Sequence, residues 1–281
     1  MIIVDGMLLA RRTNAKMDFL KNADGQPTGM EYGFLKTLKS IERKLEDSNI
    51  IVCWEGGKLK RKELSPSYKA NRDNSHLAPS FWDRLKRLQK MVAYLHDSYY
   101  SEGFEADDAM GVMAMRGLHT LKEQVYIYTN DKDLLQIVQE GISVVTSHQS
   151  HQPQLWLWEP DDVEEKYGVK GFDYVCWKAF MGDKGDNVQG VERVRKNVVA
   201  KKIKAAEDFH SMIESLWSPE GYFEGEWERV MEFTLEQFST NLELVRLHVE
   251  IELEQVKPAL KAEFEKYIEE LNIRSISYEE F

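Results

Sequence analysis

The sequence has 281 residues, 42% of them hydrophobic and 11% aromatic, with a formal net charge of -11. These values are typical of a folded protein of about two structural units and exclude a low-complexity or disordered chain. No stretch approaches the roughly 18 apolar residues of a membrane span, and the N-terminus is unlike a secretion signal, so we expect a cytoplasmic protein with no membrane partner. The two cysteines, Cys53 and Cys176, form no CxxC or Cys/His cluster and predict neither a disulfide framework nor a zinc site.

The first 160 residues alternate between strand-like and helix-like segments. Short apolar, β-branched or aromatic runs predict buried strands at 2–4, 50–54, 125–128, 143–145 and 155–158. Between them, apolar residues recur at helical spacing from Phe34 to Leu45 and from Leu85 to Val92, and 107–118 also has the composition of a helix. The alternation predicts an α/β fold with a central, mostly parallel sheet and flanking helices.

From residue 161 onward the sequence predicts helix after helix. Asp161 and Asp162 follow Pro160 and are residue types that cap helix N-termini, while glycine and proline interrupt the pattern between Ser218 and Gly225. We therefore expect an α/β domain over 1–160 and a helical region over 161–281, with the boundary defined to within several residues.

Charge is distributed unevenly along the chain. From Lys58 to Lys90 there are ten basic residues against three acidic ones, and from Glu192 to Lys204 six against one, whereas 205–281 carries nineteen acids against six bases. The net negative charge argues against a nucleic-acid partner, but the two basic zones supply the local clusters that such a partner requires. Each zone, and the acidic tail, is also explained by solvated helix faces.

Acidic residues recur at the ends of predicted strands. Asp5 follows the first strand, Glu55 the second, and Asp131 and Asp133 follow the strand at 125–128. The carboxyl ends of parallel strands are where open α/β sheets build their sites. The remaining candidate carboxylates lie near helix ends: Glu105, Asp107, Asp108, Asp183 and Asp186.

If these nine carboxylates converge, cations must accompany them, because neighbouring like charges disfavour each other's ionised forms. Mg²⁺ or Mn²⁺ is the natural neutraliser, and two such ions about 3.5–4 Å apart clamp the attacking and leaving oxygens of a phosphodiester. Each acid taken alone has a simpler interpretation as a helix cap or turn residue. In particular, Asp131 and Asp133 could cap a helix that begins at Leu134.

Five motifs in order resemble the flap endonuclease and 5′-3′ exonuclease family, which includes phage flap endonucleases and the 5′ nuclease domain of bacterial DNA polymerase I. They are Ile-Val-Asp-Gly at 3–6, Tyr-Lys-Ala-Asn-Arg at 68–72, Glu-Ala-Asp-Asp at 105–108, Thr-Asn-Asp-Lys-Asp at 129–133 and Gly-Asp-Lys-Gly-Asp-Asn-Val at 182–188. The resemblance covers 1–205 and implies a PIN-like, resolvase-like sheet followed by a helix-three-turn-helix region.

The resemblance also implies residue roles. Lys69 and Arg72 are similar to a basic pair that contacts the scissile phosphate, and 58–90 to an arch that admits single-stranded 5′ ends, with Arg61 and Tyr68 contacting DNA and Tyr68 stacking on a base or packing in the core. Glu55 stands where the family has Asp. The implied metal ligands are Asp5, Glu55, Glu105, Asp107, Asp108, Asp131, Asp133, Asp183 and Asp186.

The segment 190–203 resembles the family's hairpin that grips duplex DNA through backbone amides. Two glycines of the family pattern are replaced here by Arg193 and Arg195, and their loss is expected to weaken amide binding and any coordinated K⁺. We expect phosphate contacts from side chains instead, supplied by Arg193, Arg195, Lys196, Lys201 and Lys202.

These features together predict a monomeric, two-metal 5′ nuclease that acts on DNA with a 5′ flap or 5′ end, removes flaps or RNA primers from RNA–DNA hybrids, and works with a replication partner. Two alternatives share parts of the pattern. A PIN-type ribonuclease would keep the carboxylates without the long basic arch, and a non-catalytic DNA-structure-binding protein would keep the basic zones but lose acids. Phosphate cradles for nucleotide hydrolysis or dinucleotide chemistry are absent from the sequence.

Overall fold

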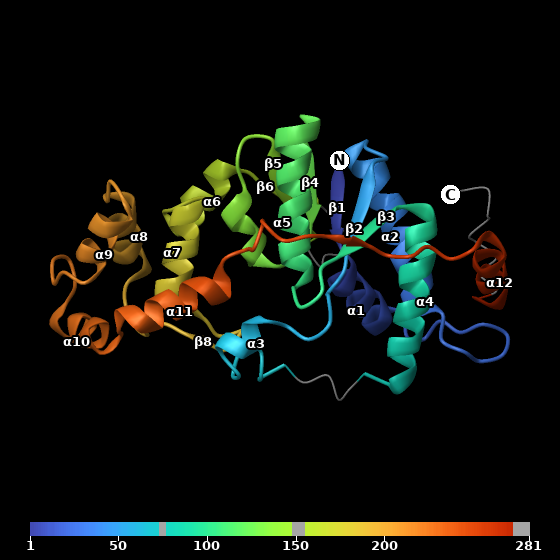
Figure 1. The fold of residues 1–281 in the computed structure, drawn as a ribbon, viewed down its shortest axis with the longest axis horizontal. Coiled ribbons are helices and arrows are strands. Elements are labelled where there is room, and N and C mark those ends of the chain that lie inside the picture. The colour runs from blue at the N-terminus through green and yellow to red at the C-terminus, as the bar shows by residue number, and fades with distance from the viewer. Residues whose placement is uncertain (73–76, 148–154, 272–281) are drawn as a thin grey trace. The chain divides into compact units, whose positions relative to one another are not determined.

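The computed structural model describes residues 1–72, 77–147 and 155–271. Its contacts divide the chain into two compact units (Figure 1). Unit 1 comprises Met1–Lys58, Ser75–Asn130 and His248–Phe281, and unit 2 comprises Leu59–Asn74 and Asp131–Leu247. The contacts change unit after Asn130, and each unit is assembled from segments distant in sequence, whereas the predicted domain boundary near residue 160 stays a prediction.

Unit 1 contains a mostly parallel sheet with the strand order β4-β1-β2-β3-β9. Strands β1 (Ile2–Asp5), β2 (Ile50–Cys53), β3 (Asp97–Tyr100) and β4 (Val125–Tyr128) run parallel, and β9 (Glu254–Gln255) pairs antiparallel with β3. All residues of β1 and β2 are buried, which explains their unbroken apolar sequence. The predicted strands in this unit are confirmed, whereas β3 and β9 were not predicted.

Helices cover this sheet. The unit contains α1 (Gly6–Lys16), α2 (Gly29–Leu45), α4 (Pro79–Leu95), α5 (Ala106–Arg116), a π-helical turn η1 (Gly117–Leu121) and α12 (Lys261–Leu271). Helix α5 packs on β1 to β4, and α1 packs on β1, β2 and α2. The carboxyl-terminal α12 packs on α2 and α4 through Phe264, Tyr267 and Leu271. The predicted α/β architecture is confirmed.

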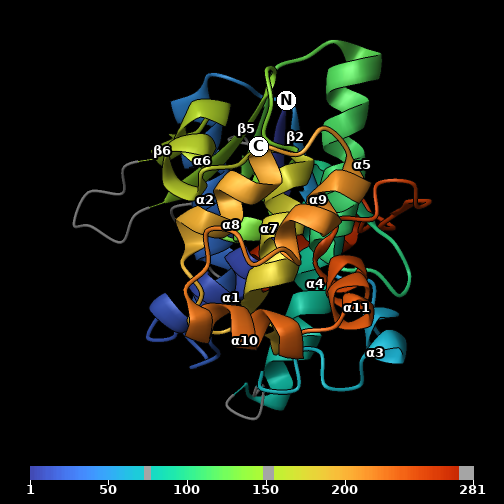
Figure 2. The same ribbon diagram turned by 90° about the vertical axis from the view of Figure 1, so that its left-hand side faces the viewer.

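Unit 2 is mainly helical (Figure 2). It contains α3 (Arg61–Leu64), a 3₁₀-helix η2 (Lys132–Ile137), α6 (Pro160–Tyr167), α7 (Phe172–Met181), α8 (Lys196–Lys204), α9 (Phe209–Leu216), α10 (Glu224–Glu232) and α11 (Leu235–Val245). Strands β5 (Ile142–Ser147) and β6 (Leu155–Trp158) pair antiparallel, as do the short β7 (Gly182–Asp183) and β8 (Val188–Gln189). Helix α7 packs against α8, α11, η2 and β7 and is buried along most of its length.

None of the helices in the described residues is long and apolar enough to cross a membrane. Both cysteines are buried free thiols.

Candidate active site

Asp5 lies at the end of β1 and caps helix α1 in unit 1. One carboxylate oxygen accepts from the amide of Leu8 at 2.8 Å, and the other from the hydroxyl of Thr129 at 3.2 Å. The next residue must be small, because a Cβ on Gly6 would come within 2.6 Å of the Trp54 ring. The Asp-Gly sequence therefore combines a fixed carboxylate with the space that a buried indole needs.

Three acids open helix α5, as predicted, and all three are buried. Asp108 is fully enclosed: one oxygen accepts from the amide of Glu105 at 3.1 Å and the other from the amide of His248 at 2.9 Å. Asp108 thus joins the start of α5 to the segment that leads to β9. Its carboxylate therefore stabilises the fold, and its role as a metal ligand, like those of Glu105 and Asp107, stays a prediction.

The thiol of Cys53 indicates how the acids of unit 1 are grouped. Its pKa is raised, first by burial and then by the carboxylates of Asp5 and Asp107, so both acids lie near the end of β2. Glu55 follows two residues later and is half-buried. Carboxylate oxygens are therefore gathered at the carboxyl ends of β1 and β2. Such hard oxygen atoms are the ligands that Mg²⁺ and Mn²⁺ prefer.

Unit 2 holds a second group of acids, formed by Asp133, Asp183 and Asp186. One carboxylate oxygen from each lies within 4.8 Å of the others, close enough for one metal ion. Asp183 and Asp186 are presented by the β7–β8 hairpin, whose ends approach so closely that a Cβ on Gly190 would lie 2.2 Å from the Gly182 nitrogen. The glycines at both ends therefore make the hairpin possible.

Lys178 pairs with two acids of this group. Its ammonium contacts Asp133 and lies 2.7 Å from Asp183 Oδ2, and the residue is only 7% exposed. Burial raises the pKa of Asp183, but Lys178 together with hydrogen bonds from the backbone amides of Gly185 and Asp186 more than offsets this, so the net pKa is lowered. Sequence reasoning missed Lys178; the available signal was one cation inside the apolar run of α7.

Asp131 has the capping role that was the simpler alternative. It is the N-cap of η2 and accepts from the amide of Asp133 at 3.0 Å. Its pKa is nevertheless raised, because withdrawal from solvent outweighs the lowering by Lys178 and Lys69. A cap that is also costly to ionise remains a candidate ligand for a divalent cation.

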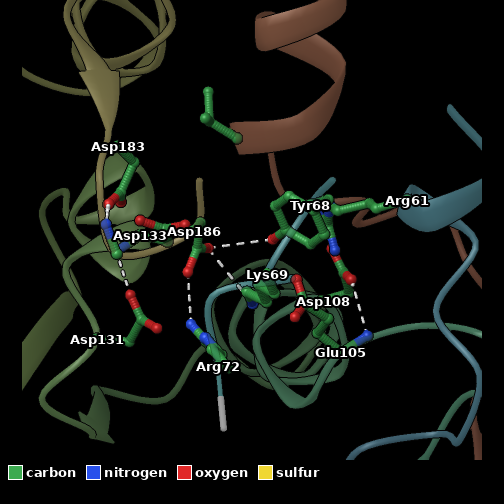
Figure 3. Close-up of polar contacts among 12 residues, drawn as sticks. Arg61, Tyr68, Lys69, Arg72, Glu105, Asp108, Asp131, Asp133, Asp183 and Asp186 are labelled. Atoms are coloured by element: carbon green, nitrogen blue, oxygen red, sulfur yellow. Dashed lines mark hydrogen bonds and ion pairs between the residues drawn. The ribbon is translucent and has the colours of Figure 1, made fainter. Parts of the chain in front are cut away.

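The three side chains at 68, 69 and 72 point toward Asp186 (Figure 3). Lys69 Nζ lies 3.4 Å from Asp186 Oδ2, Arg72 pairs with Oδ1, and the Tyr68 hydroxyl donates to Oδ2 at 3.1 Å. Tyr68 is 1% exposed, so base stacking is not available to its ring, and the expectation of core packing holds. Lys69 is buried with a φ of 53°, whereas the Arg72 side chain is 43% exposed.

Arg61 was expected to contact DNA, and the structure gives it a different role. The residue is 8% exposed and donates to the backbone carbonyl of Arg246 at 2.7 Å. It ties the short helix α3 to the end of α11. Of the expected arch, residues 73–76 lie outside the described part of the chain.

The basic residues of the hairpin at 190–203 fall into two classes. Arg193, Lys196 and Lys201 are exposed, and their contact with phosphate stays a prediction. Arg195 instead pairs with the buried Glu226 at 2.7 Å, and Lys202 donates to the carbonyls of Ser215 and Ser218 at 2.6 and 3.1 Å. The expected phosphate contacts from these two side chains are therefore replaced by internal contacts.

The grouped carboxylates of unit 2 fit divalent cations. The three-carboxylate group supplies hard oxygens, and Lys178 shows that a positive charge is accommodated among them. At the hairpin, a monovalent ion would need backbone carbonyls, yet those of Glu192 and Arg193 already accept hydrogen bonds from Arg229.

Comparison with known proteins agrees with this geometry. Residues 1–168 match the family model of the 5′-3′ exonuclease, N-terminal resolvase-like domain. A 5′-3′ exonuclease of Bacillus subtilis is 30% identical over 223 residues, covering 77% of this chain and 73% of the relative. The thermostable DNA polymerase I of Thermus filiformis is 29% identical over 99% of this chain but only 33% of its own length.

A solved structure shares the fold. The bacteriophage T5 D15 flap endonuclease, in a pseudo-enzyme-product complex with DNA and metal ions, aligns with a TM-score of 0.68 at 23% identity, covering 88% of this chain and 89% of its own. The predicted resemblance is confirmed. The chain belongs to the 5′-3′ exonuclease family and is a metal-dependent 5′ nuclease.

Proposed function

We propose that this chain hydrolyses DNA phosphodiesters at 5′ flaps and 5′ ends with Mg²⁺, and that Mn²⁺ can substitute. The observation that carries the proposal is the group of Asp133, Asp183 and Asp186 within 4.8 Å, with Lys69 and Arg72 on Asp186. Carboxylates that hold cations beside a basic pair match the needs of phosphoryl chemistry, in which charge on the non-bridging oxygens must be neutralised.

Roles follow from the contacts. Bound metal would supply an activated water and neutralise the phosphate. The residues proposed to hold divalent cations are Asp5, Glu55, Glu105, Asp107 and Asp108 in unit 1, and Asp131, Asp133, Asp183 and Asp186 in unit 2. Lys69, buried against Asp186, would offer a fixed point charge to a phosphate oxygen. Arg72 is more exposed and suits a bidentate phosphate contact.

The proposed substrate is a duplex with a 5′ flap or 5′ end, and RNA primers paired with DNA are a second substrate of the same geometry. The T5 relative was crystallised with DNA, and the exposed Arg193, Lys196 and Lys201 support a duplex-binding hairpin here. Two buried free thiols fit the reducing cytoplasm proposed as its location. We further propose that it acts as a monomer alongside replication proteins.

A panel of 5′-labelled substrates tests the proposal: flap DNA, an RNA–DNA hybrid with a recessed 5′ RNA end, single-stranded RNA and blunt DNA, each in Mg²⁺. We expect cutting of the flap near its junction, slower release of short products from the hybrid, and no cutting of free RNA. Cleavage of RNA with inert flap DNA would favour a PIN-type ribonuclease. Tight flap binding without cleavage in Mg²⁺ or Mn²⁺ would favour a structure-binding protein.

A further inference from the structure

The loop at 190–195, between β8 and α8, is held by one arginine from a neighbouring helix. Arg229 on α10 donates from Nε to the carbonyl of Glu192 and from Nη2 to the carbonyl of Arg193, both at 2.9 Å. Two consecutive carbonyls thus face a single planar guanidinium. The fork-like arrangement of guanidinium donors suits such a pair of acceptors, and its charge is permanent.

A second contact ties the same loop to the same helix. Glu226 on α10 accepts from the amide of Arg195 at 2.9 Å and from its guanidinium at 2.7 to 3.0 Å. The guanidinium also donates to the carbonyl of Gly221 at 2.7 Å and lies 3.8 Å from the centre of the Phe223 ring. Glu226 is 5% exposed, whereas the Arg195 side chain is 38% exposed, so only the carboxylate of this pair is largely removed from solvent.

The loop needs such support because of its backbone. Arg193 has a φ of 54°, in the left-handed region that favours glycine and costs a side-chain-bearing residue about 1–2 kcal/mol. A loop kept in this conformation has carbonyls turned toward one point. Backbone carbonyl oxygens are the ligands that replace the hydration shell of K⁺ in K⁺-selective channels.

We propose that α10 is a clamp for the hairpin and that Arg229 replaces a monovalent cation there. The inference rests on the proposed function, in which this hairpin binds duplex DNA. Because the positive charge belongs to the Arg229 side chain and not to a dissolved ion, the hairpin keeps its DNA-binding conformation in any monovalent salt. Duplex binding by this protein therefore depends on ionic strength but not on K⁺ itself.

The test measures binding of a fluorescein-labelled DNA duplex by anisotropy in EDTA, at one ionic strength set with KCl, NaCl or choline chloride. For the wild type we expect the same Kd in all three salts, within about twofold. Arg229→Met should raise the Kd by about tenfold in choline chloride, which is the size expected for the loss of charge-assisted hydrogen bonds. KCl should restore part of the lost affinity of this variant. Tenfold tighter wild-type binding in KCl than in choline chloride would overturn the proposal.

The control is Arg246→Met, which removes an equal charge from α11, where the side chain is 47% exposed and pairs only with Glu243 in the described contacts. It should retain wild-type affinity and salt response. Hydrogen exchange without DNA separates the clamp from the proposed function. In choline chloride, Arg229→Met should speed amide exchange at 192–195 by about tenfold while α7 stays protected. The clamp would be refuted if Arg229→Met left the amide exchange rate at 192–195 unchanged, or if KCl slowed that exchange in the wild type. Either result would count even if the protein bound no duplex.

Discussion

Lys178 lies 2.7 Å from Asp183, and its ammonium also contacts Asp133, so one buried lysine supplies the counter-charge for two of three clustered acids. Removing one partner of a buried ion pair leaves the other charged and unpaired, which typically costs about 3–5 kcal/mol. If these acids hold the metal, as proposed, the lysine and a divalent cation would stabilise the same carboxylates.

Lys178→Met should lower the melting temperature strongly in EDTA and much less in saturating MnCl₂, because an ion that binds only the folded carboxylates compensates for the lost ammonium. Calorimetry in both buffers measures the difference. Lys184→Met is the control, since that side chain is 92% exposed and should show no change in either buffer. An equal loss of stability with and without Mn²⁺ would contradict a shared role for lysine and metal.

Gly190→Ala should destabilise the protein by about 1–3 kcal/mol and reduce cleavage, because its Cβ would lie 2.2 Å from the Gly182 nitrogen and separate β7 from β8. Urea unfolding measures the loss of stability, and flap cleavage followed across a Mn²⁺ titration measures the loss of activity and of Mn²⁺ affinity. Gly225→Ala serves as the comparison, since the nearest atom to its Cβ is 3.8 Å away and alanine favours helix α10. If Gly190→Ala retained wild-type stability and Mn²⁺ affinity, the close approach would have no role in presenting Asp183 and Asp186.

The Arg195–Glu226 pair makes part of the stability pH-dependent. Hydrogen bonding to Arg195 lowers the pKa of Glu226 from 4.5 to about 2. Because the folded pKa is depressed, the contribution is complete above pH 4.5 and is lost as the pH falls through about 2. The stability difference between wild type and Glu226→Gln should therefore be constant at neutral pH and shrink in acid. A difference that grew below pH 4.5 would show that this pair does not carry the effect.

In unit 1, a buried polar network fixes α2, α4 and α12. Glu31 is 0% exposed and accepts from Arg84 at 2.9 Å and from the Tyr267 hydroxyl at 2.9 Å. Arg84→Met should cost about 3–5 kcal/mol in urea unfolding, because it leaves Glu31 buried with only the tyrosine. Arg87→Met, which removes an exposed pair with Glu270, should change stability by about 1 kcal/mol or less. Similar costs for the two variants would mean that Glu31 reaches solvent.

Local sequence patterns predicted the strands at the centre of the sheet, because buried parallel strands are continuous apolar runs. They did not predict β3, which begins at an exposed Asp97, or β9, whose two residues are both exposed and polar. Strand β3 lies between β2 and β9 but has only one buried residue, and β9 pairs at the edge of the sheet through backbone hydrogen bonds, which leave no apolar pattern in the sequence.

The candidate site was predictable as residue types but not as contacts. The positions of the carboxylates were predicted from strand ends and motifs. The internal partners of the arginines were not: Arg195 pairs with Glu226, and Arg61 donates to the carbonyl of Arg246. Those partners lie 31 and 185 residues away in sequence. Periodicity carries no information about such distant pairs, so exposed phosphate contacts and internal ion pairs looked alike.

The most direct test of the central claim is single-turnover cleavage of a 5′-flap DNA by wild type and by Asp183→Asn, in EDTA and then across a Mg²⁺ titration. We expect no cutting in EDTA, recovery of wild-type cutting with Mg²⁺, and a rate at least about a hundredfold lower for Asp183→Asn. Wild-type flap cleavage in EDTA, or an unimpaired Asp183→Asn variant, would contradict a metal-dependent nuclease that uses this group of acids.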